Sequence, residues 1–469
     1  MIPTGVAVVT ADAMRAAEEA VFAGGVSQID LMERAGAAVA REALRFAMLR
    51  PVLVLAGPGN NGGDAHVVAR LLAAAGLDVV VAAWGEPKPG VAAEMRARWT
   101  GRTVPIGKAE PRPVLIDGLL GIGKARPFAP DLAAQLKKLC DGAEFVLSID
   151  IPSGFDTDSG DALGSPLHAH CTVALGALKP VHCIGEGREK SGAVLCADIG
   201  IPVESAWRSL TRPKLATPPP DANKYTRGLV VVIEGAMPGA ARLCARASMA
   251  SGAGYVVLTG SDPGEGPPDA IVRRRIGSQQ ALAALLDDDR IGAVVFGPGL
   301  GREGDAARWL DTVLACRHPL ILDGDALSLL GESAARRVSD RGAATWLTPH
   351  SGEFERMFGA ADESKIIRTL HAAKASGATI LHKGADTVIA VPDGQAILSA
   401  NASVWLSTAG TGDVLAGILA ARIAAEPASP LDAAGAAVWL HGRAAHYCGP
   451  ALHADRLIDA LPIAIADCL

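Results

Sequence analysis

The sequence predicts an α/β protein with two domains, each an α/β/α sandwich around a mainly parallel sheet. Short apolar runs rich in β-branched residues alternate with longer stretches in which apolar residues recur at helical spacing. This alternation is typical of a parallel sheet covered by helices on both faces. The alternation stops once, in a proline-containing stretch, and then restarts. At 469 residues, the chain is also too long for one ordinary hydrophobic core.

The first half begins with two predicted helices over residues 11–49. Apolar residues recur there at helical spacing, and Ser27 is followed three residues later by Asp30, as at a helix N-cap. A strand, a glycine-rich turn and a helix over 65–75 are predicted next. The predicted strands of this half are 52–56, 79–84, 114–117 and 145–150.

A break is predicted at 211–222, where Pro218, Pro219 and Pro220 stand together. Three successive prolines do not fit a helix interior or a central strand, so we expect an extended linker. The linker would separate a first domain over 1–210 from a second over 223–469. In the second domain a helix is expected after 408–413, and strands are expected at 229–235, 255–260, 293–297, 320–323, 344–348, 379–384 and 387–391.

Composition and charge exclude several classes of protein. The net charge is −6 and the chain has no basic stripe, so we expect no nucleic-acid partner. The N-terminus lacks a secretory pattern and no long apolar run is free of Gly, Pro or charge, so we expect no membrane partner. The eight cysteines form no C-x-x-C pair. Reduced thiols and a cytoplasmic location are therefore expected.

A glycine-rich turn, GPGNNGGD at 57–64, joins the first predicted strand to the next helix. Glycines let the backbone approach a ligand closely, and N–H groups at a helix start attract phosphate. Asn60, Asn61 and Asp64 add side-chain oxygens. The turn therefore predicts a phosphate or nucleotide nearby, and the alternative is a tight turn that only closes the strand–helix unit.

Two further loops, 116–127 and 148–154, also follow strand ends. Ligands of parallel sheets bind beyond the carboxyl ends of the strands, so we expect Asp117, Asp150 and Ser153 at one crevice. Asn61, Asp117 and Ser153 are oxygen donors suited to an alkali or alkaline-earth ion. Residues 118–124 match the phosphate-loop pattern G-x-x-x-x-G-K, but Ala125 stands where that loop needs Ser or Thr, so we do not interpret it as one.

These motifs, with LMERAG at 31–36 and LKPVHCIGEGREKSGAVLCADIGIP at 178–202, resemble the NAD(P)H-hydrate epimerase family. The resemblance spans nearly the whole first half and implies a Rossmann-like domain that interconverts the R and S forms of hydrated NAD(P)H. It implies a potassium ion (K⁺) held by Asn61, Asp117 and Ser153, and a catalytic Asp150. It also implies substrate binding by Asp150, by Asn60, Asn61, Gly62, Gly63 and Asp64, and by Gly121, Ile122, Gly123, Lys124, Ala125, Arg126 and Pro127. The chain departs from the family pattern at Ala65 and Lys124.

In the second half, TAGTGD at 408–413 leads directly into a helical stretch. Its small residues and the N–H groups of the helix start suit an anion. Asp413 would then accept a proton from a hydroxyl group that attacks a phosphate. The alternative is a helix-capping aspartate. His350 in TPHSGEF and Lys383 in HKGADTVI also follow predicted strand ends.

The ordered set GPGLG, TPHSGEF, KGADT and GTGD resembles the ADP/ATP-dependent NAD(P)H-hydrate dehydratase family over about 222–469. The resemblance implies a ribokinase-like fold, phosphorylation of the hydrate hydroxyl by ADP with magnesium (Mg²⁺), and loss of phosphate to give NAD(P)H. It implies a catalytic Asp413. Hydrate binding is implied for Ala241, Gly299, His350 and Asp413, and nucleotide binding for Lys383, Gly384, Ala385, Asp386, Thr387 and Gly412.

The sequence thus predicts a bifunctional repair enzyme that acts on hydrated NADH or NADPH with an adenine nucleotide. The family resemblance also implies a homo-oligomer. Two alternatives remain: a ribokinase-class small-molecule kinase fused to a nucleotide-binding domain, and a binding protein whose first half is a nucleotide sensor. Asp117, Asp150 and Ser153 argue against the sensor. The choice between ADP and ATP, and between NADH and NADPH, stays open.

Overall fold

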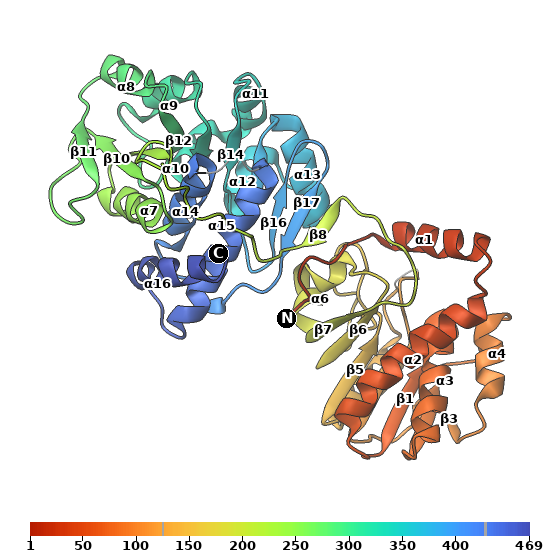
Figure 1. Ribbon diagram of the computed structural model, residues 1–469. Coiled ribbons are helices and arrows are strands. Elements are labelled where there is room, and N and C mark those ends of the chain that lie inside the picture. The colour runs from red at the N-terminus through yellow and green to blue at the C-terminus, as the bar shows by residue number, and fades with distance from the viewer. Residues whose placement is uncertain (124–125, 426–428) are drawn as a thin grey trace. The chain divides into compact units, whose positions relative to one another are not determined.

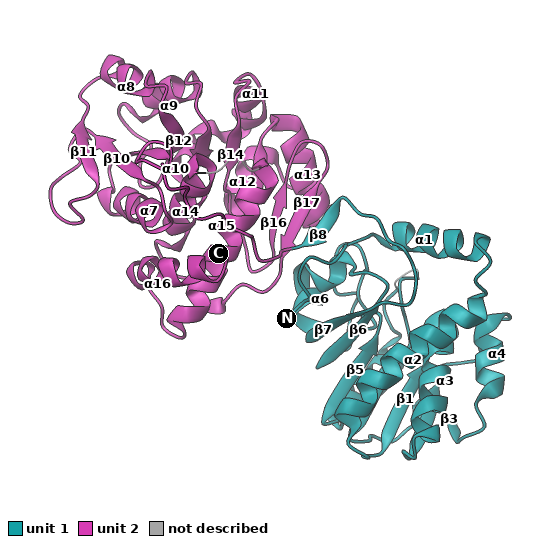
Figure 2. Cartoon of the chain, viewed as in Figure 1, with its two compact units in different colours: residues 1–209 teal, residues 210–469 magenta. Residues whose placement is uncertain are grey.

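The chain divides into two compact units, unit 1 over Met1–Ser209 and unit 2 over Leu210–Leu469 (Figure 2). The structure is a computed structural model that describes residues 1–123, 126–425 and 429–469. Each unit has a central sheet whose neighbouring strands are mainly parallel (Figure 1). The predicted α/β class with mainly parallel sheets is therefore confirmed.

Unit 1 alternates helices and strands through most of its length. Its helices are α1 (Ala11–Ala23), α2 (Gln28–Ala47), α3 (Asn60–Ala74), α4 (Val91–Arg98), α5 (Pro130–Asp141) and α6 (Gly185–Lys190), with 3-10 turns η1 (Ile106–Lys108) and η2 (Pro180–His182). Its strands are β1 (Val52–Ala56), β2 (Val79–Ala83), β3 (Thr103–Pro105), β4 (Val114–Gly118), β5 (Phe145–Ile149), β6 (Cys171–Leu175), β7 (Ala193–Ala197) and β8 (Trp207–Ser209).

The sheet of unit 1 has the order β3-β2-β1-β4-β5-β6-β7, and all these neighbours pair in parallel. Successive β1 residues point to opposite faces, as a strand requires. Val52, Val54 and Ala56 pack with apolar residues of α2 and α3, whereas Leu53 and Leu55 pack with residues of α5. Both faces are therefore covered, which explains why β1 is an unbroken apolar run.

Some boundaries differ from the prediction. Helix α3 begins at Asn60 rather than near residue 65, so NNGGD forms the start of the helix instead of a turn before it. The sequence prediction also missed β3, β6, β7 and β8. Strand β7 mixes exposed, half-buried and buried residues at the edge of the sheet, so it lacks the continuous buried run that most central strands have.

Unit 2 begins with an irregular stretch that includes Pro218–Pro220 and continues into a longer alternation. Its helices are α7 (Pro238–Ala250), α8 (Gln279–Leu286), α9 (Ala306–Leu314), α10 (Asp325–Leu330), α11 (Ala334–Ser339), α12 (Ser351–Phe358), α13 (Lys365–Ser376), α14 (Thr411–Ala425), α15 (Pro430–Cys448) and α16 (Ala454–Ala466), with 3-10 turns η3 (Gly331–Ser333) and η4 (Val404–Leu406). Its strands are β9 (Leu229–Ile233), β10 (Tyr255–Gly260), β11 (Val272–Arg275), β12 (Ile291–Phe296), β13 (Leu320–Leu322), β14 (Thr345–Leu347), β15 (Thr379–His382), β16 (Thr387–Ala390) and β17 (Ala396–Ser399).

The unit 2 strands lie in the order β11-β10-β9-β12-β13-β14-β15-β16-β17. Pairing is parallel from β11 to β15 and antiparallel from β15 to β17. One face packs against α7, α14, α15 and α16 in a large apolar cluster. The Lys383–Asp386 turn joins β15 to β16 at the point where the direction reverses.

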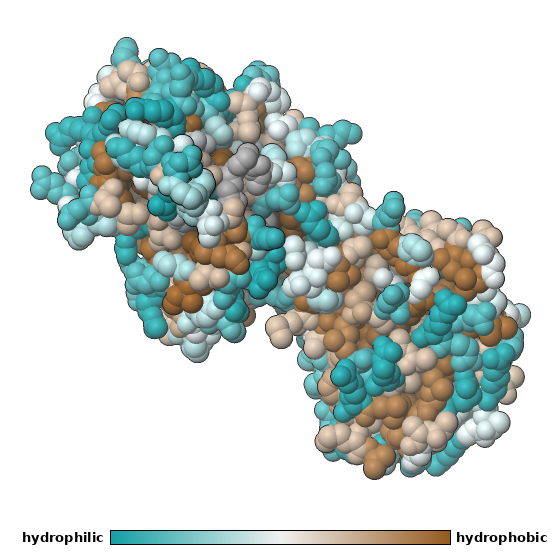
Figure 3. All heavy atoms as spheres, in the orientation of Figure 1, coloured by the Kyte–Doolittle hydropathy of each residue, from teal (hydrophilic) through white to brown (hydrophobic). Residues whose placement is uncertain are grey.

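Hydrophilic and hydrophobic residues are interspersed on the face of each unit seen in Figure 3. Large exposed apolar side chains include Met48 and Leu49 after α2, and Val404 and Trp405 in η4. Within the described residues, no helix combines the length and apolar character that crossing a membrane requires.

Candidate active sites

The start of α3 is built by close backbone packing. A Cβ atom added at Gly57 would lie 1.9 Å from the carbonyl oxygen of Leu119, and one added at Gly62 would lie 1.8 Å from that of Gly57. At Gly63 the added atom would meet Met32, whereas at Gly59 it would meet nothing within 4 Å. Three of the four glycines are therefore needed for packing, and Gly59, at the helix N-cap, faces open space.

Asp117 lies at the carboxyl end of β4 with no exposed surface. Its Oδ1 accepts hydrogen bonds from Ser153 Oγ at 2.7 Å and from the Leu119 N–H at 3.2 Å; its Oδ2 accepts from the Ser153 N–H at 2.8 Å and from Ser148 Oγ at 3.1 Å. Burial raises the pKa of Asp117, although these hydrogen bonds act in the opposite direction. The carboxylate thus fixes the loop after β5 against the end of β4.

Asn61 completes this oxygen-rich group. Its Nδ2 donates to the Leu120 carbonyl at 3.0 Å, and Ser153 Oγ lies 3.3 Å from the same carbonyl oxygen. The structure therefore brings Asn61, Asp117 and Ser153 together around Leu120. The oxygens gathered here are those of the Asp117 carboxylate, the Ser153 hydroxyl and the Leu120 carbonyl, with the Asn61 amide beside them, and such oxygens suit an alkali ion.

Asp150 follows β5 and is buried, with a left-handed backbone at φ 64°. Its Oδ1 accepts from Lys179 Nζ at 2.5 Å and from the Leu175 N–H at 3.0 Å. His182 Nε2 lies 2.8 Å from the Asp150 carbonyl oxygen. Non-glycine residues in this backbone region are strained, and such strain concentrates at functional sites.

Two more carboxyl groups face Asp150. Burial, followed by the charges of Asp150 and Glu18, raises the pKa of Asp64 well above its usual value. Burial and the charge of Asp150 also raise the pKa of Glu18 on α1. The site therefore combines an ion-paired carboxylate with two carboxyl groups whose pKa values are raised.

The loop predicted to line the epimerase substrate is placed in part. Gly121 packs beside the Asn61 side chain, and the Ile122 carbonyl accepts from Arg15. Gly123 and Pro127 are exposed. The Arg126 guanidinium lies 5.3 Å from the ring centre of Trp84. Lys124 and Ala125 lie outside the described residues.

In unit 2, helix α14 begins at Thr411, so Gly412 and Asp413 stand in its first turn. The Thr411 hydroxyl donates to the Leu406 carbonyl at 2.8 Å, and His441 Nε2 lies 2.9 Å from the Thr411 carbonyl. Burial, together with the charge of Asp323, raises the pKa of Asp413 to about 6, although Lys383 acts in the opposite direction. Asp413 can therefore serve as a base near neutral pH.

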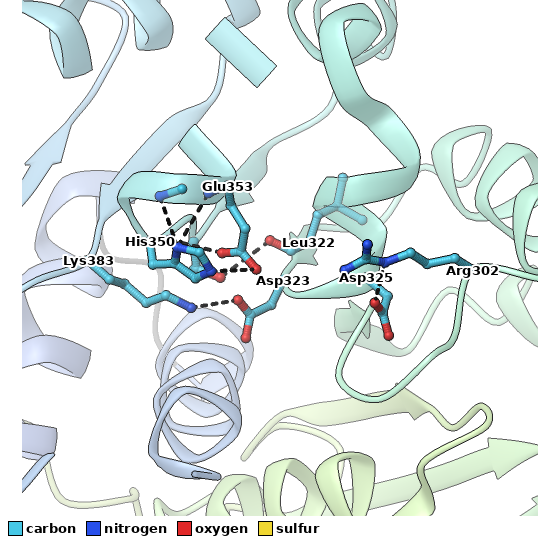
Figure 4. Close-up of polar contacts among 9 residues, drawn as sticks. Arg302, Leu322, Asp323, Asp325, His350, Glu353 and Lys383 are labelled. Carbon is cyan, nitrogen blue, oxygen red and sulfur yellow. Dashed lines mark hydrogen bonds and ion pairs between the residues drawn. The ribbon is translucent and has the colours of Figure 1, made fainter. Parts of the chain in front are cut away.

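Lys383 and Asp323 point toward each other beside this helix start (Figure 4). Lys383 Nζ lies 2.8 Å from Asp323 Oδ1, and a Cβ atom added at Gly412 would lie 3.5 Å from the same Nζ. Burial disfavours the Lys383 charge, but Asp323, Glu353 and Asp413 raise its pKa overall. The structure therefore brings Asp323, Lys383, Gly412 and Asp413 together.

His350 is the N-cap of α12. Its Nδ1 accepts from the N–H groups of Gly352 at 3.0 Å and Glu353 at 3.3 Å, and Glu353 Oε2 accepts from the His350 N–H at 2.9 Å (Figure 4). This reciprocal arrangement is a capping box. The side chain is 57% exposed, so it is open to a ligand as well.

The loop after β12 is fixed by the other aspartate of DGDAL. Asp325 accepts from the Gly301 N–H and from Arg302 Nε, both at 2.9 Å (Figure 4). Gly299 is buried with φ 61°, and a Cβ atom there would lie 2.2 Å from the Met237 carbonyl. Ala241 has no exposed surface because it packs in the apolar cluster on α7. The structure therefore does not bring the Ala241 side chain to a ligand-accessible surface.

The turn from Lys383 to Thr387 is held by local contacts. The Gly384 N–H donates to Thr387 Oγ1 at 3.2 Å, and Thr387 Oγ1 donates to the Gly384 carbonyl at 2.9 Å. Asp386 pairs with Lys365 at 2.5 Å. Ala385 is exposed at the tip of this turn.

Sequence reasoning assigned no role to Lys179, His182, Glu18 or His441, which the structure places in these sites. Lys179 and His182 stand in the LKPVH segment after β6, and β6 itself was not predicted. Recognising CTVAL as a central strand would have placed the next loop at the same edge as Asp117 and Asp150. Glu18 and His441 lie on helices, and nothing in their spacing marks them.

The two units define a class of protein: a two-part α/β enzyme with an aspartate–lysine group beside the strand ends of each sheet. Family models separate the same two parts. A model described as YjeF-related protein N-terminus matches residues 28–181, and one described as NAD(P)H-hydrate dehydratase matches 230–461.

Whole-chain relatives carry one shared name. A bifunctional NAD(P)H-hydrate repair enzyme Nnr of Mycobacterium tuberculosis is 34% identical over 432 residues, covering 88% of this chain and 88% of the relative. The Escherichia coli protein of that name is 32% identical and covers 92% of this chain and 88% of the relative. A solved ADP/ATP-dependent NAD(P)H-hydrate dehydratase from Bacillus subtilis, co-crystallised with ATP and Mg²⁺, is 29% identical, covers 55% of this chain and 95% of that chain, and has a TM-score of 0.48. The chain belongs to the family of bifunctional NAD(P)H-hydrate repair enzymes.

Proposed function

We propose that the chain repairs hydrated NAD(P)H in two steps. Unit 1 interconverts the R and S hydrates, and unit 2 dehydrates the S hydrate to NAD(P)H at the expense of ADP, which becomes AMP and phosphate. The observation that carries the proposal is that relatives named for this repair match the chain across both units. The Asp150–Lys179 pair and Asp413 beside Lys383 supply the acid–base groups that the two steps need.

In unit 2, Asp413 takes the proton from the hydroxyl group of the S hydrate as its oxygen attacks the β-phosphorus of ADP. A new P–O bond forms and the bond to AMP breaks. The C–O bond of the phosphorylated hydrate then breaks, phosphate leaves, and a neighbouring carbon loses a proton to restore the double bond. His350 and Gly299 are the proposed hydrate contacts, with Ala241 limited to packing behind them because it is fully buried.

The adenine nucleotide is assigned to the start of α14 at Gly412 and to the turn Lys383, Gly384, Ala385, Asp386 and Thr387. N–H groups at a helix start favour phosphate. The described residues hold no group of three His, Cys, Asp or Glu side chains gathered as a metal site. Mg²⁺ would be held chiefly through the nucleotide phosphates, whose negative charge it would neutralise.

In unit 1, Asn61, Asp117 and Ser153 would hold K⁺, which supplies a fixed positive charge beside the bound hydrate. The oxygens of Asp117, Ser153 and the Leu120 carbonyl, with the Asn61 amide beside them, support this assignment. Asp150 is the proposed proton-transfer group. The runs 60–64 and 121–127 are proposed to bind the substrate.

Assembly as a homo-oligomer is proposed from the family resemblance, and a cytoplasmic location is proposed from the cysteines. The eight cysteines are free thiols, which suits a reducing compartment.

The test is absorbance in the reduced-nicotinamide band, with purified protein, chemically prepared hydrated NADH and Mg²⁺, and with ADP or ATP in parallel. Recovery of absorbance with free phosphate released is expected with ADP. Recovery from both epimers also tests unit 1. A stable phosphorylated small molecule without recovered absorbance would contradict the proposal and support the kinase alternative.

A further inference from the structure

Lys179 is a buried cation beside the proposed catalytic group of unit 1. Its side chain is 1% exposed, and its Nζ lies 2.5 Å from Asp150 Oδ1 and 2.7 Å from the Leu175 carbonyl oxygen. Leu175 also donates its N–H to Asp150 Oδ1 at 3.0 Å. Both donors therefore hold the same carboxylate oxygen, and within the described residues no donor is assigned to Oδ2.

The same segment also holds the backbone of Asp150. The Lys179 N–H donates to His182 Nδ1 at 2.9 Å, so the ring proton lies on Nε2, which donates to the Asp150 carbonyl oxygen at 2.8 Å. Burial, together with the charge of Lys179, lowers the pKa of His182 to about 4, so the ring is neutral at neutral pH. This contact holds the backbone of Asp150, whose φ is 64°. The turn at Lys179–His182 thus anchors both the side chain and the strained backbone of Asp150.

The other titratable groups that face Asp150 are mostly acids. They are Glu18 on α1, Asp64 on α3 and Cys196 on β7. Removing the Lys179 charge would leave the Asp150 carboxylate buried among carboxyl groups without a counter-charge. The ionised carboxylate would then lose the contact that offsets its burial.

We propose that Lys179 is a positioning residue for epimerisation, which fixes Oδ1 of Asp150 and leaves Oδ2 to exchange a proton with the hydrate. This inference rests on the proposed function of unit 1. Epimerisation changes the configuration at the carbon that bears the added hydroxyl group, and no atom is gained or lost. When Oδ2 takes up the hydroxyl proton, the C=O bond forms and the ring C–N bond at that carbon breaks, with its electron pair going to the ring nitrogen; when the ring closes on the other face, the C–N bond re-forms and Oδ2 returns the proton. His182 supports the same geometry through the Asp150 backbone.

The experiment compares Lys179→Met, Lys179→Arg and Lys137→Met in the full chain. Lys137 is the matched control because it pairs with Asp141 at the same 2.5 Å, but on the exposed surface of α5 with 74% and 63% of the two side chains exposed. The rate of conversion of purified R hydrate to S hydrate is measured from pH 5 to 9 without nucleotide. Dehydration of the S hydrate after ADP and Mg²⁺ are added reports intact unit 2, and hydrogen exchange in unit 1 reports the folded fraction of unit 1.

Lys179→Met is expected to lower kcat for epimerisation by about 100-fold at pH 7 with little change in KM, the size typical for loss of acid–base catalysis. Its acid limb should move to higher pH. Lys179→Arg keeps the charge but changes the contact geometry, so kcat should fall without that movement. Lys137→Met should match the wild type in both respects.

Wild-type kcat and pH profile in Lys179→Met would overturn the inference while leaving the proposed function intact. If Lys179→Met does not fold, Lys179→Arg is the deciding variant. If the activity of Lys179→Arg falls only in proportion to its folded fraction, kcat per folded molecule is unchanged and the inference is overturned as well. If the wild type itself does not interconvert the hydrates, the proposed function of unit 1 fails, and the role of Lys179 fails with it.

Discussion

The two units place an aspartate and a lysine beside the strand ends in different ways. In unit 1 the lysine pairs directly with the proposed catalytic group, since Lys179 Nζ contacts Asp150. In unit 2 the lysine pairs with a neighbour, since Lys383 contacts Asp323 and Asp413 stands beside the pair. The consequence is chemical: Asp413 experiences both the Asp323 charge and burial, which raise its pKa to about 6. In unit 1 the lysine thus holds the Asp150 carboxylate in an ion pair, whereas in unit 2 burial and Asp323 raise the pKa of Asp413 toward neutral pH.

The strongest way to test this difference is Asp413→Asn. The amide keeps the size of the side chain but cannot accept the hydroxyl proton, so kcat for dehydration is expected to fall by about 10²–10⁴. The measurement is recovery of the reduced-nicotinamide absorbance from S hydrate with ADP and Mg²⁺. Epimerisation by unit 1 in the same protein is the control and should be unchanged. Retained dehydration would return Asp413 to the role of a helix-capping residue.

The glycines at the start of α3 can be tested by stability. Gly57→Ala places a methyl group 1.9 Å from the carbonyl oxygen of Leu119, so the backbone must move. Overpacking of this kind is expected to lower the free energy of unfolding of unit 1 by about 1–3 kcal/mol. Gly59→Ala is the matched control because its added methyl group meets nothing within 4 Å. Denaturant unfolding monitored by hydrogen exchange in α3 separates the two, and equal stability would contradict the packing role.

These glycines also show what sequence could and could not predict. The alternation of apolar runs was sufficient for the fold class and for most central strands, because buried parallel strands are continuous in hydrophobicity, but the buried strand β6 was missed. The alternation also failed for β7, which mixes exposed, half-buried and buried residues, and for β11, which carries Arg273–Arg275. The motif glycines predicted a ligand site, but only the packed backbone shows that Gly57, Gly62 and Gly63 are required by close contacts.

The site residues also divide into those that local sequence singles out and those that only the folded structure brings together. Asp117, Ser153, Lys383 and Asp413 follow strand ends or open a helix, so local sequence was enough to single them out. The Asp150–Lys179 pair joins residues 29 positions apart. Glu18 reaches the same group from α1. Such contacts depend on how distant segments pack, which periodicity along one segment does not encode.

The tuning of Asp413 predicts a pH dependence. Asp413 must be ionised to accept a proton, and its raised pKa of about 6 means that kcat/KM for dehydration should fall about tenfold per pH unit below pH 6. Asp323→Asn removes a charge that raises this pKa and frees Lys383 to lower it, so the acid limb should move to lower pH. Titration of ADP itself affects all variants equally.

Asp325→Asn is the control for that movement. Asp325 belongs to the same DGDAL segment but contacts the Gly301 N–H and Arg302 instead of Lys383. The acid limb of the pH profile of Asp325→Asn should coincide with that of the wild type. If Asp323→Asn and Asp325→Asn give the same profile, the Asp323–Lys383 pair does not tune Asp413.

The smallest expected effect separates the two roles of His350. Its Nδ1 caps α12, so His350→Ala should lower the free energy of unfolding of unit 2 by about 1 kcal/mol. Asn is a strong N-cap residue, so His350→Asn should restore most of that stability while still removing the exposed imidazole. If His350 also contacts the hydrate, as we propose, KM for the S hydrate should rise in both variants. A wild-type KM in His350→Asn would leave His350 with the capping role alone, and the hydrate contact would then have to come from the other residues around Asp413.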